Sequence, residues 1–190
     1  MLGFEQSIAL FALALHTSAI PLVANRDVVQ DLFTRDDSSS CMSNNNALQI
    51  GGLWVELIGN YTQDLADAVL LPGFTDYSDS ALSLNSACPQ TTGPTPALMS
   101  AVFENRTHFE AGQGPQPSIQ STISQVWNGC TSVTMRYQMT NLGTRPVVGL
   151  IVMDVVEAPA GSSYPYQLAG MFSEFDVGSW ISNLKDAGEC

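Results

Sequence analysis

Two carboxylates in the segment FTDYSDS have the spacing and the setting that acid–base chemistry requires. Asp76 lies in a short run, 74–77, that predicts a strand, and Asp79 follows three residues later. A carboxyl group on a strand that faces an apolar interior has a raised pKa, because burial disfavours its charged form. Such a group can act as a general base near neutral pH. We expect Asp76 in this role, with Asp79 as the alternative; the competing interpretation is that an acid here caps the following turn.

His108 is the second candidate for proton transfer. It lies in a predicted helix over 103–113, three residues after Asn105, which is a suitable N-cap. Its imidazole could donate a proton to a ligand oxygen, or it could simply lie on the surface. One histidine beyond the N-terminal leader and four well-separated cysteines do not supply the ligands of a metal site. We therefore expect no metal and no cofactor.

Two predicted helices precede the acids. Apolar residues recur at i, i+3, i+4 and i+7 over 47–59, which is typical of a helix with one buried face. A second helix is expected over 63–70, with Thr62 as its N-cap and the Pro-Gly pair 72–73 as its end. A Pro- and Thr-rich connection over 88–97 then leads to the third helix.

The rest of the chain has the pattern of an antiparallel meander. Four runs rich in Val, Ile, Thr, Met and aromatic residues are separated by turn sequences of hairpin length. The expected strands are 119–128, 131–140, 146–157 and 166–176, and a short helix is expected over 179–184. This order predicts an α+β fold, in which a strongly curved antiparallel sheet packs around three N-terminal helices.

The inner face of this sheet is expected to enclose an apolar pocket. Within the run 131–140, apolar and polar residues alternate, so that one face of the strand belongs to the core. Aromatic and sulfur-containing side chains line many sites for apolar ligands, although most such side chains form ordinary core. The candidates for ligand binding are Trp54, Tyr61, Trp127, Tyr137 and Met153.

The beginning of the chain has the features of an export signal. Residues 8–15 are apolar but too short to span a bilayer, and small residues follow up to Ala24, so 1–24 is interpreted as a signal peptide. Residues 25–40 are polar and are expected to form a flexible lead-in to one domain over 41–190. We therefore expect a secreted protein.

Cysteine usage and charge are consistent with export. Four dispersed cysteines predict two disulfides that tie down the ends of the chain, and the sequence leaves three pairings open. The formal net charge of −12 makes nucleic acid and anionic membrane surfaces unsuitable partners. Two asparagines stand in N-glycosylation acceptor sequences. The cysteines are Cys41, Cys88, Cys130 and Cys190, and the asparagines are Asn60 and Asn105.

The order of elements resembles the nuclear transport factor 2-like (NTF2-like) cone, a fold family that includes ketosteroid isomerase, scytalone dehydratase and SnoaL-type polyketide cyclases. The segments NYTQDLADAVLLPGFTDYSDS, FENRTHFEAGQGPQP, VWNGC, VVGLIVMDVVEAPAGSS and FSEFDVGSW resemble a group of exported fungal proteins with that domain. The resemblance covers residues 41–190. It implies homodimers that form through the outer face of the sheet.

The resemblance carries over to few site residues. In isomerase-like members a carboxylate on the strand after the second helix acts as the base, and Asp76 best matches that place. The phenol on their first helix is unmatched, because Trp54 stands about where it would fall and Tyr61 comes later. The paired histidines of dehydratase-like members are also missing, since His108 stands alone in the domain.

Two functions are open. The first is a cofactor-free isomerase, lyase or cyclase that acts on a small, apolar, polyketide-like metabolite, with Asp76 moving the proton and a polar neighbour steadying negative charge on the substrate. The second is a non-catalytic secreted protein that binds a small ligand or a partner. An enclosed pocket that contains Asp76 favours the first function, and an interior filled by the protein's own side chains favours the second.

Overall fold

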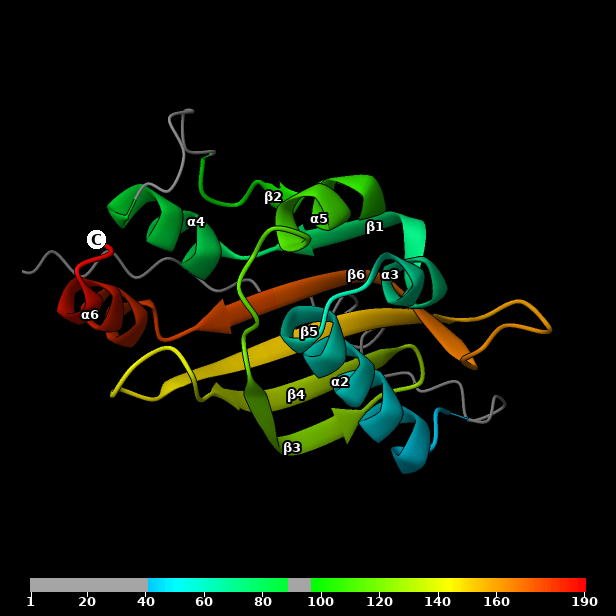
Figure 1. Cartoon of the computed structure of the whole chain (residues 1–190). Helices are drawn as coiled ribbons and strands as arrows, with labels where there is room; N and C mark the ends of the chain where they lie inside the picture. The colour runs from blue at the N-terminus through cyan, green and yellow to red at the C-terminus, as the bar shows by residue number, and fades with distance from the viewer. Residues whose placement is uncertain (1–40, 89–96) are drawn as a thin grey trace, which may run out of the picture. The chain divides into compact units, whose positions relative to one another are not determined.

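The computed structural model describes residues 41–88 and 97–190 (Figure 1). The predicted signal peptide and lead-in lie outside this part of the chain, as does most of the predicted Pro- and Thr-rich connection. No helix within the described residues has the length and apolar character needed to cross a bilayer. The helices are α2 (Asn44–Gly59), α3 (Gln63–Val69), α4 (Asp79–Ala87), α5 (Arg106–Gln113) and α6 (Val177–Ala187). The strands are β1 (Leu70–Tyr77), β2 (Ala101–Phe103), β3 (Ser121–Asn128), β4 (Ser132–Met139), β5 (Val147–Glu157) and β6 (Tyr166–Phe175).

All six strands form one sheet in the order β2-β1-β6-β5-β4-β3. The four strands β3 to β6 are the predicted antiparallel meander, with each strand paired to the next one along the chain. Strand β1 adds to β6 in the parallel direction, and the short β2 pairs with the end of β1. The predicted α+β fold with a curved sheet around helices is confirmed. The sheet is nevertheless not wholly antiparallel, because one of its five pairings is parallel.

Side-chain caps fix where the helices begin. Thr62 and Asn105 are the N-caps of α3 and α5, as predicted, and each accepts a bond from the backbone N–H three residues later. Ser78 caps α4 in the same way, and it begins a regular helix that was not predicted from the sequence. These bonds satisfy N–H groups that have no partner inside a helix.

The Pro-Gly pair at Pro72 and Gly73 does not end the second helix as predicted. Helix α3 stops at Val69, and the pair lies inside β1 instead. The pairing of β1 with β6 is interrupted between Leu70 and Thr75. Proline has no N–H for a ladder bond, so it is tolerated in a strand where pairing is interrupted.

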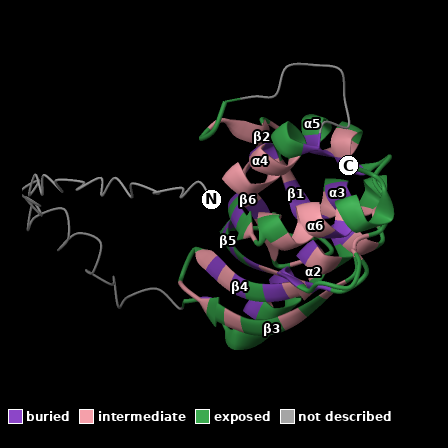
Figure 2. Cartoon of the chain, turned by 90° about the vertical axis from the view of Figure 1, so that its left-hand side faces the viewer, coloured by how far each residue is buried: buried purple, intermediate pink, exposed green. Residues whose placement is uncertain are grey.

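The core lies between the concave face of the sheet and the helices (Figure 2). Helix α2 packs on β3 and β4, and its buried side chains alternate with exposed ones at helical spacing. The predicted inner face of β4 is confirmed, because Val133, Met135, Tyr137 and Met139 are all buried. These residues and the inner residues of β5 and β6 form one apolar cluster with α2.

Phe109 on α5 stands at the centre of the aromatic part of this cluster. Its ring is 1% exposed and meets Phe74 and Phe103 edge to face, at centroid distances of 5.7 and 5.4 Å. Trp54 of α2 lies 6.0 Å away and Tyr61 lies 6.4 Å away. One side chain therefore joins α5 to α2, β1 and β2.

Two disulfides close the chain over long separations. Cys41 is bonded to Cys130 in the β3–β4 turn, and Cys88 at the end of α4 is bonded to Cys190. The prediction of two disulfides that hold the ends of the domain is confirmed, and the pairing is now assigned. Disulfides persist in oxidising compartments, so the chain is suited to such an environment.

Replacing Phe109 with alanine tests the central position of this ring. We expect Phe109→Ala to lower the free energy of unfolding by about 3–5 kcal/mol, because it removes a large buried ring and leaves a cavity. Chemical denaturation followed by circular dichroism measures this change. The matched control is His108→Ala on the exposed face of the same helix, which should change stability by less than about 0.5 kcal/mol. Equal effects of the two substitutions would contradict the assigned position.

Candidate functional site

Asp76 lies at the inner face of β1, near the end of the strand. It is paired with Phe103 of β2 on one side and with Met171 of β6 on the other. The residue is 5% exposed, and its Oδ1 atom has no hydrogen-bond partner among the described residues. Carboxylate oxygens that are buried in this way are rare, because their desolvation is costly.

The surroundings of Asp76 favour its neutral form. Burial raises the pKa of Asp76 to about 7, and the negative charge of Glu174 on β6 adds to the rise. Burial acts because the charged form loses its hydration, and a nearby like charge acts in the same direction. A carboxyl group with a pKa near 7 is half-protonated at neutral pH, so it can both accept and donate a proton.

Three other polar residues lie at this end of the inner face. Ser78 and Ser173 are buried, and each follows by two residues a member of the paired positions Asp76 and Met171. Ser173 lies in β6, whereas Ser78 lies just after β1 and is the N-cap of α4. Tyr137 of β4 is buried as well, and its pKa is raised by burial and by the charges of Asp76 and Glu174. We call Asp76, Ser78, Ser173 and Tyr137 the polar corner. The phenol of Tyr137 stays protonated at neutral pH, so it acts as a hydrogen-bond donor toward a negative group.

Gly149 allows the ring of Tyr137 to lie across β5. Tyr137 and Gly149 are paired positions of β4 and β5. A Cβ atom at position 149 would come within 2.6 Å of the Tyr137 Oη atom and within 2.9 Å of the carbonyl oxygen of Glu174. No side chain fits in this space. The absence of a side chain on β5 therefore lets the phenol extend toward β6.

The expected pocket-lining residues are mostly core. Trp54 and Met153 are buried in the apolar cluster, and Tyr137 belongs to both this cluster and the polar corner. Tyr61 is half-buried at the edge of the cluster, where its hydroxyl donates to Gln63 Oε1 at 3.4 Å. The side chains predicted to surround a ligand thus pack against one another.

Trp127 does not lie on the inner face as expected. It is 45% exposed on the outer face of β3. The register of β3 against β4 shifts between Ile123 and Gln125, which indicates a β-bulge. An extra residue in a strand reverses the alternation of side chains, so that Val126 faces the core and Trp127 faces outward.

His108 and Asp79 are not brought to the polar corner. His108 is exposed in the first turn of α5, and its backbone N–H donates to Asn105 Oδ1 at 2.8 Å. Asp79 is the first residue of α4, and its Oδ1 accepts a bond of 2.6 Å from the backbone N–H of Met99. Asp79 therefore holds a loop, whereas the cap that was predicted for an acid in this segment is supplied by Ser78.

The two asparagines of the acceptor sequences occupy different settings. Asn60 is exposed at the C-cap of α2, where its Nδ2 donates to Glu56 Oε1 at 3.1 Å. Asn105 is half-buried and uses its Oδ1 as the cap of α5. The side chain of Asn60 is thus more accessible to a modifying enzyme.

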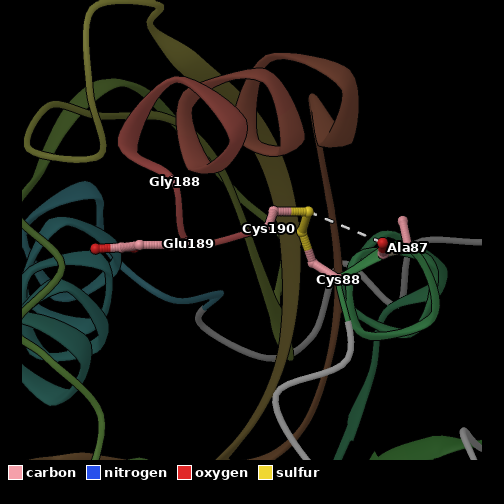
Figure 3. Close-up of a pocket in the computed structure, with 5 residues that line it drawn as sticks. All are labelled: Ala87, Cys88, Gly188, Glu189 and Cys190. Carbon is pink, nitrogen blue, oxygen red and sulfur yellow. Dashed lines mark hydrogen bonds between the residues drawn. A yellow bond between two sulfur atoms is a disulfide. The ribbon is translucent and has the colours of Figure 1, made fainter.

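A cavity lies at the far end of α4 from Asp76. It has a volume of about 460 Å³ and is lined by Ala87, Cys88, Gly188, Glu189 and Cys190 (Figure 3). Its wall includes the Cys88–Cys190 disulfide. Glu189 is its one titratable side chain, and in Figure 3 that side chain points away from the disulfide. This cavity does not contain the predicted acid.

Sequence reasoning did not place three polar residues near Asp76. The alternation of β4 placed Tyr137 on the inner face, but it did not indicate that Tyr137 lies near Asp76. Ser173 and Glu174 carried no motif. Their proximity to Asp76 comes from the parallel pairing of β1 with β6, which joins residues about one hundred positions apart and has no local signal.

Replacing Asp76 with asparagine tests whether this acid is buried with a raised pKa. The folded-state pKa of about 7 lies above the ordinary value of 3.8, so the folded chain binds the extra proton between these values. The wild-type free energy of unfolding should therefore fall as pH rises from about 4 to above 7, by a total of about 4 kcal/mol. Asp76→Asn should remove most of this fall and be the more stable protein at pH 8.

Denaturation with urea at a series of pH values measures both curves. Asp154→Asn, which neutralises an exposed carboxylate on the outer face of β5, is the matched control and should keep the wild-type slope. If Asp76→Asn and wild type show parallel curves, Asp76 does not titrate with a raised pKa.

Comparison with known proteins is consistent with this fold. A family model described as an NTF2-like domain matches residues 40–187. A protein from Kribbella flavida DSM 17836 is 12% identical, with a TM-score of 0.50 over 80% of this chain and 100% of that chain. None of the curated proteins matches the chain.

Two further solved structures are similar at lower scores. IdmH from Streptomyces antibioticus, a candidate polyketide cyclase, is 8% identical, with a TM-score of 0.49 over 73% of this chain and 98% of that chain. A LEH-like epoxide hydrolase from M. tuberculosis is 12% identical, with a TM-score of 0.47 over 75% of this chain and 91% of that chain. Sequence identities this low support a shared fold but say nothing about a shared reaction. On the family match, which covers most of its length, the chain belongs to the NTF2-like domain family.

Proposed function

We propose that this protein is a cofactor-free acid–base enzyme, an isomerase, lyase or cyclase, in which Asp76 moves the proton. The observation that carries the proposal is the buried Asp76 carboxyl, whose Oδ1 has no partner among the described residues and whose pKa is raised to about 7. An unpartnered acid in a core costs stability, and perturbed acids of this kind cluster at functional sites. Its free oxygen can accept a bond from a ligand once neighbouring core side chains move aside.

Tyr137 is the polar neighbour that would steady negative charge on the substrate. Its phenol is protonated at neutral pH, and it lies in the same electrostatic environment as Asp76. A hydrogen-bond donor in a dry site stabilises negative charge more than it would in water. The apolar cluster around the polar corner supports a small apolar metabolite as the substrate, and the resemblance to polyketide cyclases suggests the polyketide class.

The packed interior supports the second function. Trp54 and Met153, which were expected to line a pocket, are buried against the protein's own side chains. A filled interior leaves room for a ligand only if side chains move. A non-catalytic role in binding a small molecule or a partner would use the same fold without turnover.

We also propose that the protein is exported, because it has two disulfides and its N-terminal sequence has the features of a signal peptide. Both disulfides would form in the secretory pathway. Asn60 is then the better glycan acceptor, because its side chain is exposed and serves only a surface bond to Glu56. The intact mass of protein taken from culture medium would report both the mature N-terminus and any glycan.

Association of two copies through the outer sheet face is proposed as well. An apolar and aromatic row crosses this face at paired positions of five strands, and Phe172 is 51% exposed there. Tyr77 stacks on Phe172 at a centroid distance of 5.4 Å. The row consists of Trp127, Thr134, Val152, Phe172 and Tyr77. Exposed apolar patches of this kind commonly mark interaction surfaces.

Turnover by variants of Asp76 and Tyr137 tests the enzyme proposal. Compounds that co-purify with the protein from its native host are identified by mass spectrometry and offered as substrates. Asp76→Asn should lower kcat by at least about a hundredfold, because general acid–base catalysis contributes about 10²–10⁴ in rate. Tyr137→Phe should lower it by about tenfold or more.

His108→Ala is the matched control and should keep full turnover, since His108 is exposed. Retained turnover in folded Asp76→Asn would rule out the catalytic assignment. A compound that binds without being converted by wild type would support the non-catalytic function instead.

Sedimentation velocity tests the outer face. We expect wild type to sediment as a dimer at micromolar concentration and Val152→Glu to sediment as a monomer, because a charge at the centre of the row would be buried by association. Thr140→Glu, at an exposed turn position, is the control and should remain a dimer. A monomeric wild type would exclude this use of the face.

A further inference from the structure

Glu174 binds the start of α4 to the end of β6. Its Oε1 and Oε2 atoms accept bonds from the backbone N–H groups of Asp79 and Ser80, both at 3.0 Å. The hydroxyl of Ser80 also donates to Oε2, and it accepts a bond of 3.1 Å from the backbone N–H of Phe175. We call this set, made of Glu174, Asp79, Ser80 and Phe175, the α4 latch. It fixes both the first turn of α4 and the position of one negative charge.

The residues of the α4 latch closely follow Asp76 and its β6 partner along the chain. Asp79 and Ser80 are three and four residues beyond Asp76, and Glu174 is three residues beyond Met171, the β6 partner of Asp76. Backbone N–H groups at a helix start bind a carboxylate in its ionised form. A fixed charge therefore stands at the same end of β6 as the buried acid, on the opposite face of the sheet.

The other charged groups near β1 have different partners. On α5, which packs against β1, Arg106 forms an ion pair with Asp67 at 2.9 Å and lies 3.3 Å from Glu110. His108 on the same helix is exposed, and Asp79 of α4 binds Met99. On β4, the charge of Asp76 acts on the phenol of Tyr137 and helps to keep it protonated. Glu174 is thus the charged group that bears most directly on the Asp76 carboxyl.

We propose that Glu174 is a positioning residue for Asp76: through the α4 latch it keeps the Asp76 carboxyl inside the core and holds a fixed negative charge at the same end of the sheet. Two effects act together. The anchored first turn of α4 holds the end of β1 against β6, which preserves the burial of Asp76. The fixed negative charge opposes a second negative charge on Asp76. The inference rests on the role proposed for Asp76, and it adds a residue that sets the pH at which that role operates.

Direct titration of Asp76 tests the proposal. The carboxyl carbon of Asp76 is followed by NMR over pH 4–9 in the full domain, and its signal is assigned by its loss in Asp76→Asn. Glu174→Gln keeps the size and an acceptor oxygen of the side chain but removes its charge. We expect the Asp76 midpoint to fall by about one pH unit in Glu174→Gln.

Two variants separate the local charge from other effects. Glu174→Asp keeps the charge and should restore most of the wild-type midpoint. Glu157→Gln, at an exposed position at the end of β5, removes one negative charge elsewhere and should leave the midpoint unchanged. If Glu174→Gln does not fold, Ser80→Ala weakens the latch while both carboxylates remain, and it should also lower the midpoint.

The outcomes distinguish the two proposals. A wild-type midpoint near 7 that stays there in Glu174→Gln, or in Ser80→Ala where that variant replaces it, overturns the inference and leaves the proposed function standing. A wild-type midpoint near 4 overturns the inference too, and it also removes the observation on which the proposed function rests. A midpoint near 7 that falls in Glu174→Gln, together with full turnover by Asp76→Asn, supports the latch but not the enzyme.

Discussion

The buried ring of Phe109 is the contact on which the arrangement of helices and sheet depends. It reaches α2 through Trp54, β1 through Phe74 and β2 through Phe103. Edge-to-face packing of this kind adds geometric specificity to the apolar burial. Space for it is narrow, since a Cβ atom at Gly112 would come within 2.5 Å of the Phe103 ring. A side chain at position 112 would therefore disturb the contact between α5 and β2.

Asp76 is the main exception to this apolar packing. A core built mainly of apolar groups contains a carboxyl with an oxygen that lacks a partner in the described part of the chain. Local disagreement with the rules of core packing is expected where a protein has a function to perform. The rest of the fold stabilises the chain enough to tolerate it. The disulfides and the aromatic cluster supply this stability, and the cluster reaches Asp76 itself through Phe103, its partner on β2.

Local features were predictable from the sequence, and long-range pairings were not. Thr62 and Asn105 could be recognised as caps because a capping bond spans three residues. Asp76 could be proposed because its strand follows a clear helix. Trp127 was assigned to the wrong face because a β-bulge has no reliable sequence pattern. The partners of Asp76 were missed because β1 pairs in parallel with β6, across nearly the whole domain.

The disulfide pairing has a topological consequence. The loops closed by Cys41–Cys130 and Cys88–Cys190 overlap, since Cys88 lies within the first loop and Cys130 lies within the second. One peptide-bond cleavage at any place between Cys41 and Cys190 therefore leaves both fragments covalently joined. A protease that cuts the chain once cannot release a piece of the domain. The protein would keep its mass and its neighbouring core segments after such a cut, and this form of resistance does not depend on the free energy of unfolding.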